Sequence, residues 1–419
     1  MVVQWRVWKL VTEKNSGFEL LLNFHMSRSL ITGIDIGTYH VKVVIAHSTE
    51  RNEKGFPKII GTGTAESRGL RHGYIVNIRD VTNSVRRALD EAEKKADVKV
   101  KKAFVSIGGI GLSSMTSTSS VIITRADSEI TELDLRKVQE QCEKDIPANA
   151  SLNKKIIHSI PMQFKIDGKL ALGKPEGMKG NKLEVKTLYV TCLEHHLNDL
   201  IQAVEEAGVS VQDVMASPIA ASLVTLNKSQ KIAGCILANI GAETVAIAVF
   251  ENNMPVSLEV FPIGSTDITN DIALGLKVPL EEAEQIKIGA ITGSSYPRKK
   301  LEEIIFARLS DIFELIEAHL KKIGRNGLLP AGIVITGGGS GLASIEEMAK
   351  VSLKLPSRLG TINLGAQDKQ VFRDSTWAVA YGLCILGAHA DEDMPIDSSI
   401  RVFENSKKTI KAWLKQFLP

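Results

Sequence analysis

Three short segments of the sequence have the residue types and spacing that hold a ligand against the backbone. In residues 332–342, GIVITGGGSGL, an apolar strand runs into a row of glycines and then into a helix expected over residues 344–350. Glycine lets the backbone approach a ligand closely, and the N–H groups at a helix start attract anions. Such a turn is also common in tight connections and in Rossmann sites, although the usual dinucleotide spacing is missing here.

The other two segments are strand–turn–strand units that repeat one another. Residues 31–46, ITGIDIGTYHVKVVIA, and residues 235–250, CILANIGAETVAIAVF, both place an apolar strand, a polar residue, Ile-Gly and a second apolar strand in the same order. This repetition predicts an internal duplication. The alternative is that any β-hairpin has a glycine turn, and the presence of the third segment disfavours it.

Regular elements are expected on both sides of these turns. The first unit divides into strands over residues 30–36 and 41–46, and a third strand is expected near residues 59–63. A helix with one apolar face is expected over residues 81–95, and a strand over residues 103–107. This alternation of strands and helices favours an α/β layer.

The region from residue 108 to 190 differs from the preceding segment in its residue pattern and is expected to form an inserted subdomain. It contains a Ser/Thr-rich edge, a helix that opens at Thr131 with Asp134 in its first turn, and extended segments with glycine turns. A helix over residues 194–207 then leads to the second strand–turn–strand unit. The last core helix is expected over residues 377–388.

Length and composition indicate a folded protein of two or more domains. The 419 residues are 44% apolar and 24% charged, which is far from the composition of disordered chains. Because 51 basic residues nearly balance 48 acidic ones, no overall field favours nucleic acid as a partner. The four cysteines include no Cys-x-x-Cys pair, which disfavours a zinc site or a disulfide framework and fits a reducing cytoplasm.

The N-terminus is expected to lie outside the fold, and no segment is expected to cross a bilayer. A membrane span needs about 18 or more apolar residues, and the sequence has no such run. Residues 1–25 contain acids and lack the small-residue cleavage site of a signal peptide. We therefore expect translation to begin at Met26 rather than at Met1.

Two repeated hairpins followed by a Gly-Gly-Gly-Ser turn resemble the superfamily of actin, sugar kinases and Hsp70, in which two similar domains close over ATP and Mg²⁺. The resemblance implies that Asp35 approaches the metal through water and that backbone N–H groups hold the phosphates. The alternative for Asp35 is a carboxylate that caps the turn. The residues implied at the nucleotide are Asp35, Gly37, Thr38, Tyr39 and Lys42 at the first hairpin, Asn239, Gly241 and Ala242 at the second, and Gly338, Gly339 and Ser340 beside the adenosine.

Further stretches are similar to the FtsA family of bacterial cell-division proteins. Residues 158–168 and 175–185 resemble that family's inserted subdomain, and residues 264–288 and 303–316 resemble its fourth subdomain. The implied fold class is α/β, an actin-like duplicated ATPase fold of two domains and four subdomains. The implied division is an N-terminal extension (1–25), subdomain 1A (26–107, 191–231 and a last helix in 371–390), inserted subdomain 1C (108–190), subdomain 2A (232–258 and 329–370), subdomain 2B (259–328), a linker (391–405) and a membrane-targeting amphipathic helix (406–419).

Three positions qualify the implied chemistry. Lys287 would reach toward the adenosine by this likeness, and the alternative is a solvated lysine paired with Glu284. Asn239 stands where the second hairpin usually carries an aspartate, and an amide supplies neither the charge that helps to hold Mg²⁺ nor a base. We therefore expect a slow ATPase at most. Glu243 occupies a position that is usually glycine-rich, where a carboxylate near phosphate would repel it and harm turnover more than binding.

The last residues, SKKTIKAWLKQFLP, have the pattern of an amphipathic helix. Aromatic residues on one face and only basic charge on the other suit an anionic membrane surface. The alternative is docking on the protein's own core or on a partner. The apolar stripe consists of Ile410, Trp413, Leu414, Phe417 and Leu418, and the basic positions are Lys407, Lys408, Lys411 and Lys415.

The likeness implies an ATP-dependent membrane adaptor. Such a protein would self-associate into filaments, bind the tubulin homologue FtsZ through subdomain 2B, meet other division proteins, and act on the cytoplasmic side of the inner membrane at the septum. A sugar kinase, one alternative, would need a catalytic aspartate and a substrate-lined cleft after the first domain. A type IV pilus assembly protein, the other alternative, would reach the membrane through a partner protein instead of a terminal helix.

Overall fold

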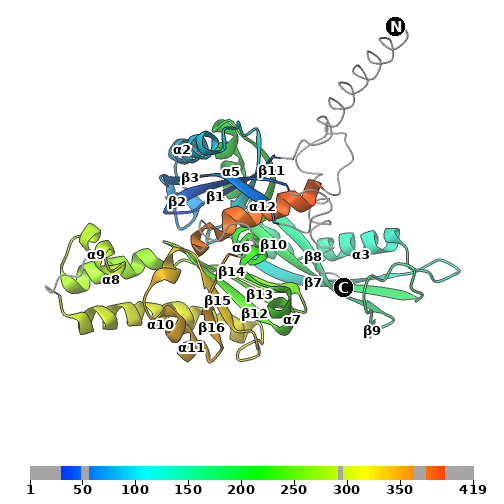
Figure 1. Ribbon diagram of the computed structural model, residues 1–419. Helices are drawn as coiled ribbons and strands as arrows, with labels where there is room; N and C mark the ends of the chain where they lie inside the picture. The colour runs from blue at the N-terminus through cyan, green and yellow to red at the C-terminus, as the bar shows by residue number, and fades with distance from the viewer. Residues whose placement is uncertain (1–29, 49–55, 291–295, 363–373, 392–419) are drawn as a thin grey trace, which may run out of the picture.

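The computed structural model describes residues 30–48, 56–290, 296–362 and 374–391 (Figure 1). The expectations for residues 1–25, for the linker and for the helix over residues 406–419 lie outside these ranges. In the part of the chain that is described, no helix is long and apolar enough to cross a membrane.

The first domain is built on a five-stranded sheet with the order β11-β6-β1-β2-β3. Strands β1, β2 and β3 form an antiparallel meander, and β6 and β11 continue the sheet in parallel with β1. The strands expected around the first hairpin and before the inserted region are thereby confirmed. Their bounds are Leu30–Ile36 (β1), His40–His47 (β2), Lys58–Glu66 (β3), Lys102–Ile107 (β6) and Ser210–Ala216 (β11).

The second domain repeats this topology in a sheet with the order β14-β13-β12-β15-β16. Again the first three strands in the chain form an antiparallel meander, and two later strands run parallel to the first of them. The internal duplication that the two hairpins predict is therefore confirmed. The bounds are Cys235–Ile240 (β12), Val245–Glu251 (β13), Met254–Phe261 (β14), Ile333–Thr336 (β15) and Ser357–Leu359 (β16).

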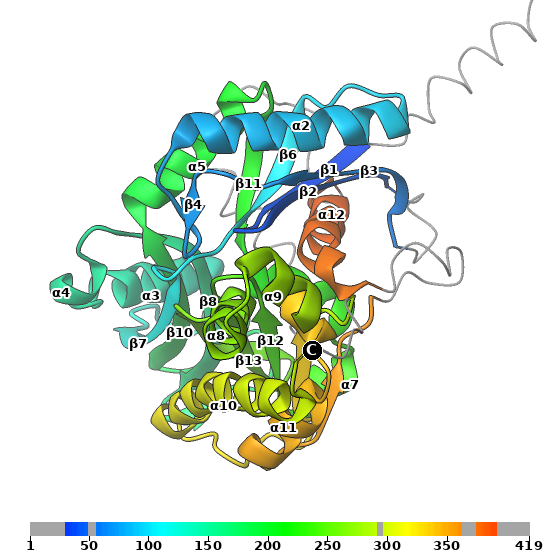
Figure 2. The same cartoon turned by 90° about the vertical axis from the view of Figure 1, so that its left-hand side faces the viewer.

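Helices α2 (Ile78–Ala96) and α5 (Glu194–Glu206) cover the outer face of the first sheet (Figure 2). Helix α2 begins where the side chain of Asn77 accepts a hydrogen bond from the N–H of Asp80, and ends at Asp97 in the left-handed conformation. Its buried positions recur with helical spacing, as the sequence predicts.

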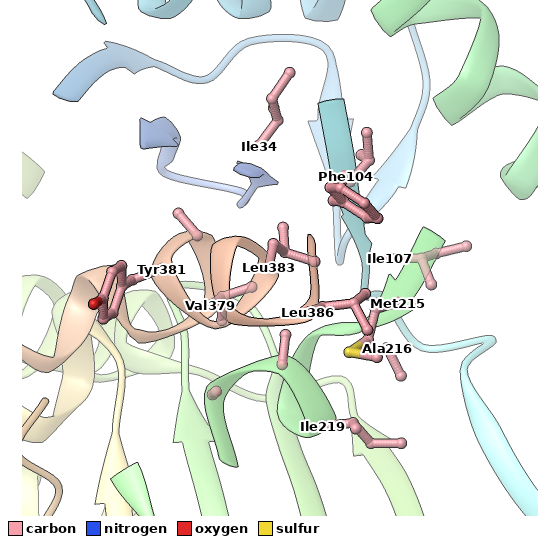
Figure 3. Packing of buried hydrophobic residues seen from close by; sticks show 14 of the residues in the cluster. Ile34, Phe104, Ile107, Met215, Ala216, Ile219, Val379, Tyr381, Leu383 and Leu386 are labelled. Carbon is pink, nitrogen blue, oxygen red and sulfur yellow. The ribbon is translucent and has the colours of Figure 1, made fainter. Parts of the chain in front are cut away.

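Helices α6 (Ser217–Thr225) and α12 (Ala378–Asp391) fill the space between the two sheets (Figures 1 and 3). Two glycines let β1, α12 and α6 approach one another closely. A Cβ atom on Gly33 of β1 would lie 2.2 Å from the carbonyl oxygen of Ala380, and one on Gly382 would lie 1.9 Å from that of Ala220. The last core helix, expected over residues 377–388, is thus the central packing element of the fold.

The second sheet buries both faces, in agreement with the alternation of side chains along a strand. In β12, Cys235 and Leu237 pack toward the first domain, whereas Ile236, Ala238 and Ile240 pack against the helices of the second. The helical elements of this domain are α7 (Lys228–Ala233), α8 (Ser265–Leu276), α9 (Leu280–Lys287), α10 (Arg298–Lys322) and α11 (Ile345–Leu353), with the short 3-10 turn η1 (Gly338–Gly341). A second 3-10 turn, η2 (Ser375–Trp377), directly precedes α12.

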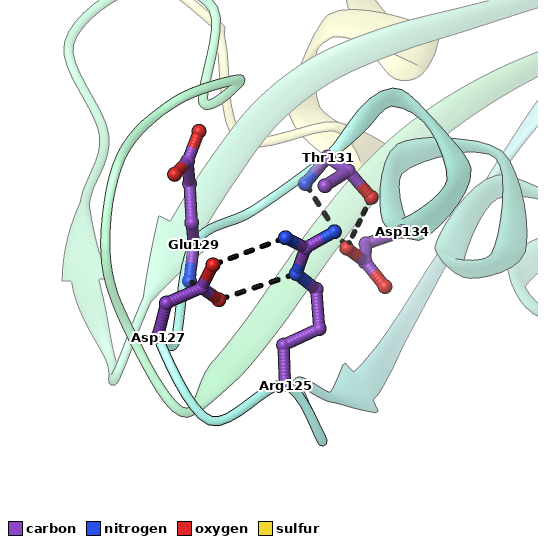
Figure 4. Close-up of polar contacts among 5 residues, drawn as sticks. All are labelled: Arg125, Asp127, Glu129, Thr131 and Asp134. Carbon is purple, nitrogen blue, oxygen red and sulfur yellow. Dashed lines mark hydrogen bonds and ion pairs between the residues drawn. The ribbon is translucent and has the colours of Figure 1, made fainter.

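The inserted region forms a sheet of order β7-β10-β8-β9, with α3 packed on one face. Its helix begins as predicted, because the side chain of Asp134 accepts hydrogen bonds from the N–H and hydroxyl of Thr131 (Figure 4). Before it, the guanidinium of Arg125 holds Asp127 with two hydrogen bonds of 3.2 and 3.0 Å (Figure 4). The bounds are Ser113–Ile122 (β7), Glu132–Lys144 (α3), Ala148–Ser151 (α4), Lys154–Ile166 (β8), Lys169–Leu170 (β9) and Lys182–Leu193 (β10). A hairpin of β4 (Leu70–Arg71) and β5 (Tyr74–Ile75) lies earlier in the chain.

One buried carboxyl group predicts a pH dependence of stability. Asp213 follows a register shift in β11, and burial raises its pKa from 3.8 to about 7, opposed in part by a hydrogen bond from the N–H of Val214. The folded protein therefore holds a proton that the unfolded chain releases near pH 4, so stability falls as pH rises from 4 to 7. Asp213→Asn should raise the free energy of unfolding at pH 8 by about 2 kcal/mol, because the amide carries no charge but still loses hydration. Urea denaturation at pH 5 and pH 8 measures this, and an equal effect at both values would contradict it.

Candidate functional site

A cleft opens between the two domains, and all three segments singled out by the sequence reach it. Its empty space is about 930 Å³, including the part open to solvent. Eight of the residues expected at the nucleotide line this cleft. They are Asp35, Gly37, Thr38, Tyr39, Lys42, Asn239, Gly241 and Gly338.

The two hairpins have the same turn. The N–H of Gly37 donates to the carbonyl of His40 at 3.2 Å, and the N–H of Gly241 donates to the carbonyl of Thr244 at 2.8 Å. Both turns therefore close with the same three-residue spacing, as expected for a duplicated unit. The N–H of Gly37, expected on phosphate, is used to close the turn, and the next two residues, Thr38 and Tyr39, lie at the tip that lines the cleft.

Asp35 lies at the end of β1, where its carboxylate meets the end of β6. The hydroxyl of Ser106 donates to Oδ1 of Asp35 at 2.7 Å. Desolvation raises the pKa of Asp35, and the hydrogen bond from Ser106 and the charge of Lys42 oppose this shift. The carboxylate is therefore in a site where a bound cation would offset the cost of its burial.

Lys42 stands opposite Asp35 in the register of β1 and β2. Its ammonium group donates to the carbonyl of Thr376 at 2.9 Å and lies over the ring of Trp377, 5.5 Å from the centroid. Desolvation lowers the pKa of Lys42, while the charges of Asp35 and Asp374 oppose the shift. The first hairpin is thus tied to the chain segment that starts the last core helix.

The glycine turn after β15 approaches the second hairpin closely. A Cβ atom on Gly337, which has a positive φ of 88°, would lie 2.3 Å from Oδ1 of Asn239. Gly339 is buried against Ile240 instead of lining the cleft. The hydroxyl of Ser340 donates to the carbonyl of Gly337 at 2.7 Å and contacts Ser375 at 3.2 Å, also outside the lining. A 3-10 turn, rather than a direct strand-to-helix connection, therefore precedes α11.

Lys287 and Ala242 are near the second hairpin but do not line the cleft. The ammonium group of Lys287 is buried, at 2.6 Å from Glu284, 2.8 Å from the hydroxyl of Thr269 and 3.2 Å from the carbonyl of Ser265. The pair with Glu284 that the sequence offered as an alternative is present, although this lysine is not solvated. The carbonyl of Ala242 accepts from the N–H of Thr266, which fixes the start of α8 on the hairpin.

Several residues of the cleft were not predicted from the sequence. Ser106 and the two glycines that follow β6 had a signal, because a strand that ends in Ser-Ile-Gly-Gly has the same small-residue character as the predicted turns. Ser375 and Thr376 had none, because they are brought in by the last helix from far along the chain. The unpredicted lining residues include Gly73, Ser106, Gly108, Gly109, Ser217, Thr244, Thr336, Ser375 and Thr376.

The chemistry of the lining suits a phosphate ligand with Mg²⁺. Asp35 is the one carboxylate among the described residues that line the cleft, and no group of three His, Cys, Asp or Glu side chains that would hold a metal by itself occurs in the described chain. Mg²⁺ is commonly held by one or two carboxylates together with water and substrate phosphates. The residues present therefore fit a metal that arrives with a nucleotide.

Proteins of one family match most of the chain. The model described as cell division protein FtsA matches residues 236–382, and the one described as the SHS2 domain inserted in FtsA matches residues 109–191. The chain is 30% identical over 417 residues to the cell division protein FtsA of Pseudomonas aeruginosa, covering 94% of this chain and 98% of the relative. It is 31% identical over 366 residues to that of Bacillus subtilis, covering 82% and 81%.

Solved structures show the same fold at lower identity. The chain resembles a protein of the PilM-PilN type IV pilus biogenesis complex with a TM-score of 0.63 and 16% identity, over 86% of this chain and 99% of the other. It also resembles the ethanolamine utilization protein EutJ from Carboxydothermus hydrogenoformans, with a TM-score of 0.51 and 15% identity, over 86% and 91%. At these identities the likeness concerns the fold alone, and the actin-like fold class expected from the sequence is confirmed.

Proposed function

The chain belongs to the FtsA family of cell-division proteins, and on this basis we propose that it is an ATP-binding, self-associating adaptor that ties the division ring to the membrane. The adaptor's ligand is ATP with Mg²⁺, and its protein partner is FtsZ, bound through subdomain 2B. The proposed site of action is the cytoplasmic side of the inner membrane at the septum. Other division proteins and further copies of this chain complete the set of partners.

The observation that carries the nucleotide part of the proposal is the matched pair of hairpins across one cleft. Each hairpin has the same hydrogen-bonded turn, and both line the cleft together with Gly338 of the glycine turn. Backbone N–H groups at such turns hold phosphate without a charged side chain. In this arrangement Asp35 would hold the metal through water, and Lys42 would supply a positive charge beside the phosphates.

The proposed activity is binding with slow hydrolysis at most. Asn239 lines the cleft on the second hairpin, where its amide neither adds charge for Mg²⁺ nor accepts a proton from water. Asp35 is the one carboxylate among the described residues of the lining, and it already accepts a hydrogen bond from Ser106. A site built in this way suits a protein whose nucleotide controls assembly.

The membrane part of the proposal rests on the sequence of the last helix, which lies outside the described residues. A single short helix binds reversibly, so self-association would raise its avidity for the membrane. A role in pilus assembly has no support beyond the likeness of fold at 16% identity, and no feature of the cleft favours a sugar kinase.

ATP binding predicts a rise in melting temperature that depends on one carboxylate. A ligand at about 100 times its dissociation constant stabilises the folded state by about 2.7 kcal/mol, so ATP with Mg²⁺ should raise the melting temperature of the wild type by several degrees. Asp35→Asn keeps an acceptor for the hydroxyl of Ser106 but removes the charge, so the extra stabilisation that Mg²⁺ adds to ATP should be lost. Differential scanning fluorimetry with ATP, with and without Mg²⁺, measures both effects.

Asp90→Ala, at an exposed acid on α2, is the matched control and should respond to Mg²⁺ and ATP as the wild type does. The nucleotide proposal is wrong if the wild type shows no shift up to millimolar ATP. The assignment of Asp35 to the metal is wrong if Asp35→Asn keeps the whole Mg²⁺-dependent part of the shift.

A further inference from the structure

The turn between β4 and β5 in the first domain lies against the second hairpin of the other domain. The backbone N–H of His72 donates to the carboxylate of Glu243, and the ring Nδ1 of His72 lies 3.3 Å from the carbonyl oxygen of the same residue. Glu243 follows Gly241 in the turn, yet it is absent from the residues that line the cleft. The carboxylate expected to repel phosphate is therefore directed to the other domain.

The same turn touches the point where the chain enters the inserted subdomain. A Cβ atom on Gly73 would lie 2.4 Å from Cα of Gly109, and both glycines have positive φ angles, 78° and 87°. The N–H of Ile110 donates to the carbonyl of His72 at 3.4 Å. This entry segment follows directly after β6, whose Ser106 holds the carboxylate of Asp35.

Tyr74, one residue further along, contacts the point where the chain leaves the inserted subdomain. Its ring is stacked with His195 at 6.3 Å between centroids and meets the edge of His196 at 5.0 Å, both in the first turn of α5. A Cβ atom on Gly111 would lie 2.3 Å from the hydroxyl oxygen of Tyr74. The β4–β5 hairpin therefore holds both ends of the inserted subdomain and one turn of the other domain.

We propose that Glu243 is a positioning residue that holds the two domains together beside the cleft through its contacts with His72, which we call the latch. We propose further that the β4–β5 hairpin couples the making and breaking of this latch to the root of the inserted subdomain. The root is residues 109–112 together with residues 193–196. Movement of the second hairpin against the first domain changes the contact at His72, and the close backbone contact of Gly73 with Gly109 transmits that change. The contacts between His72 and Glu243 support the latch directly, whereas its response to nucleotide rests on the proposed function.

Hydrogen exchange in the nucleotide-free protein tests the latch. Glu243→Ala removes the acceptor for the N–H of His72, so amides in residues 72–75 and 109–112 should exchange about tenfold faster than in the wild type. Glu243→Gln keeps a side-chain oxygen acceptor at the same place and should restore most of the protection. Glu281→Ala, which removes an exposed acid on α9, is the matched control and should leave both segments unchanged.

Wild-type exchange rates in residues 72–75 of Glu243→Ala would overturn the latch, and faster exchange there without any change in residues 109–112 would overturn its connection to the inserted subdomain. With ATP and Mg²⁺ added, residues 109–112 should become more protected in the wild type and Glu243→Gln, but not in Glu243→Ala. An equal response in Glu243→Ala would overturn the coupling. If ATP leaves the melting temperature of the wild type unchanged, the proposed function fails, while the nucleotide-free comparison still decides the latch.

Discussion

Gly382→Ala should destabilise the folded chain by about 3–5 kcal/mol, because the added methyl group meets the backbone of a neighbouring helix. The added Cβ would lie 1.9 Å from the carbonyl oxygen of Ala220 and 2.6 Å from its carbonyl carbon. Both atoms belong to the backbone of α6, so rotation of a side chain cannot relieve the overlap. Helix α12 would have to move away from α6, but its other face already packs closely against β1 at Gly33.

Gly341→Ala is the matched control, since a Cβ there meets no atom within 4 Å and the residue does not have a positive φ. The midpoint of urea denaturation should fall markedly for Gly382→Ala and stay within experimental error for Gly341→Ala. Equal midpoints would mean that α6 and α12 do not pack through this contact. Movement of α12 would also disturb the cleft, because this helix begins next to Thr376, whose carbonyl accepts a hydrogen bond from Lys42.

The parts of the fold that could be predicted from the sequence are those with a local signal. Both hairpins have two apolar strands around an Ile-Gly turn, and Asp134 of the capping pair lies three positions after Thr131, so each feature can be identified within a short window. The duplication needed only a comparison of two such windows. The cleft follows from the duplication, since two like sheets that face each other bring their equivalent turns together.

The parts that could not be predicted depend on contacts between distant segments. The hydrogen bond from His72 to Glu243 joins residues 171 positions apart, and that from Lys42 to Thr376 joins residues 334 apart. No periodicity or motif specifies such a pair. For this reason the sequence assigned Glu243 to repulsion of phosphate, whereas its backbone position lets the side chain leave the cleft.

Lys287 shows why a correct local pair can still leave the role of a residue open. The spacing of three residues from Glu284 predicts the ion pair, which is present at 2.6 Å. The spacing does not predict burial, which comes from α8 packing over α9 and adds the hydroxyl of Thr269 and the carbonyl of Ser265 as partners. Because Ser265 in turn donates to the carbonyl of Gly241, the lysine supports the second hairpin through α8.

The double substitution of Trp413 and Phe417 by glutamate should release the protein from anionic vesicles. Burial of one large apolar side chain contributes about 2 kcal/mol, so loss of two, together with repulsion of two new acids by the surface, should lower the affinity for vesicles at least about a hundredfold. Co-sedimentation with vesicles rich in anionic lipid measures the bound fraction. ATP with Mg²⁺ should strengthen binding of the wild type, because self-association presents several helices at once.

Two further proteins separate a membrane anchor from a helix that docks on the protein itself. A chain ending at Glu404 lacks the whole helix and should stay in solution. Val351→Glu places a new acid at an exposed apolar side chain of α11 and should sediment as the wild type does. Equal melting temperatures of the wild type and the double glutamate variant of the tail would show that the helix does not contribute to the folded core. If the double glutamate variant of the tail still sediments, the tail is not the anchor.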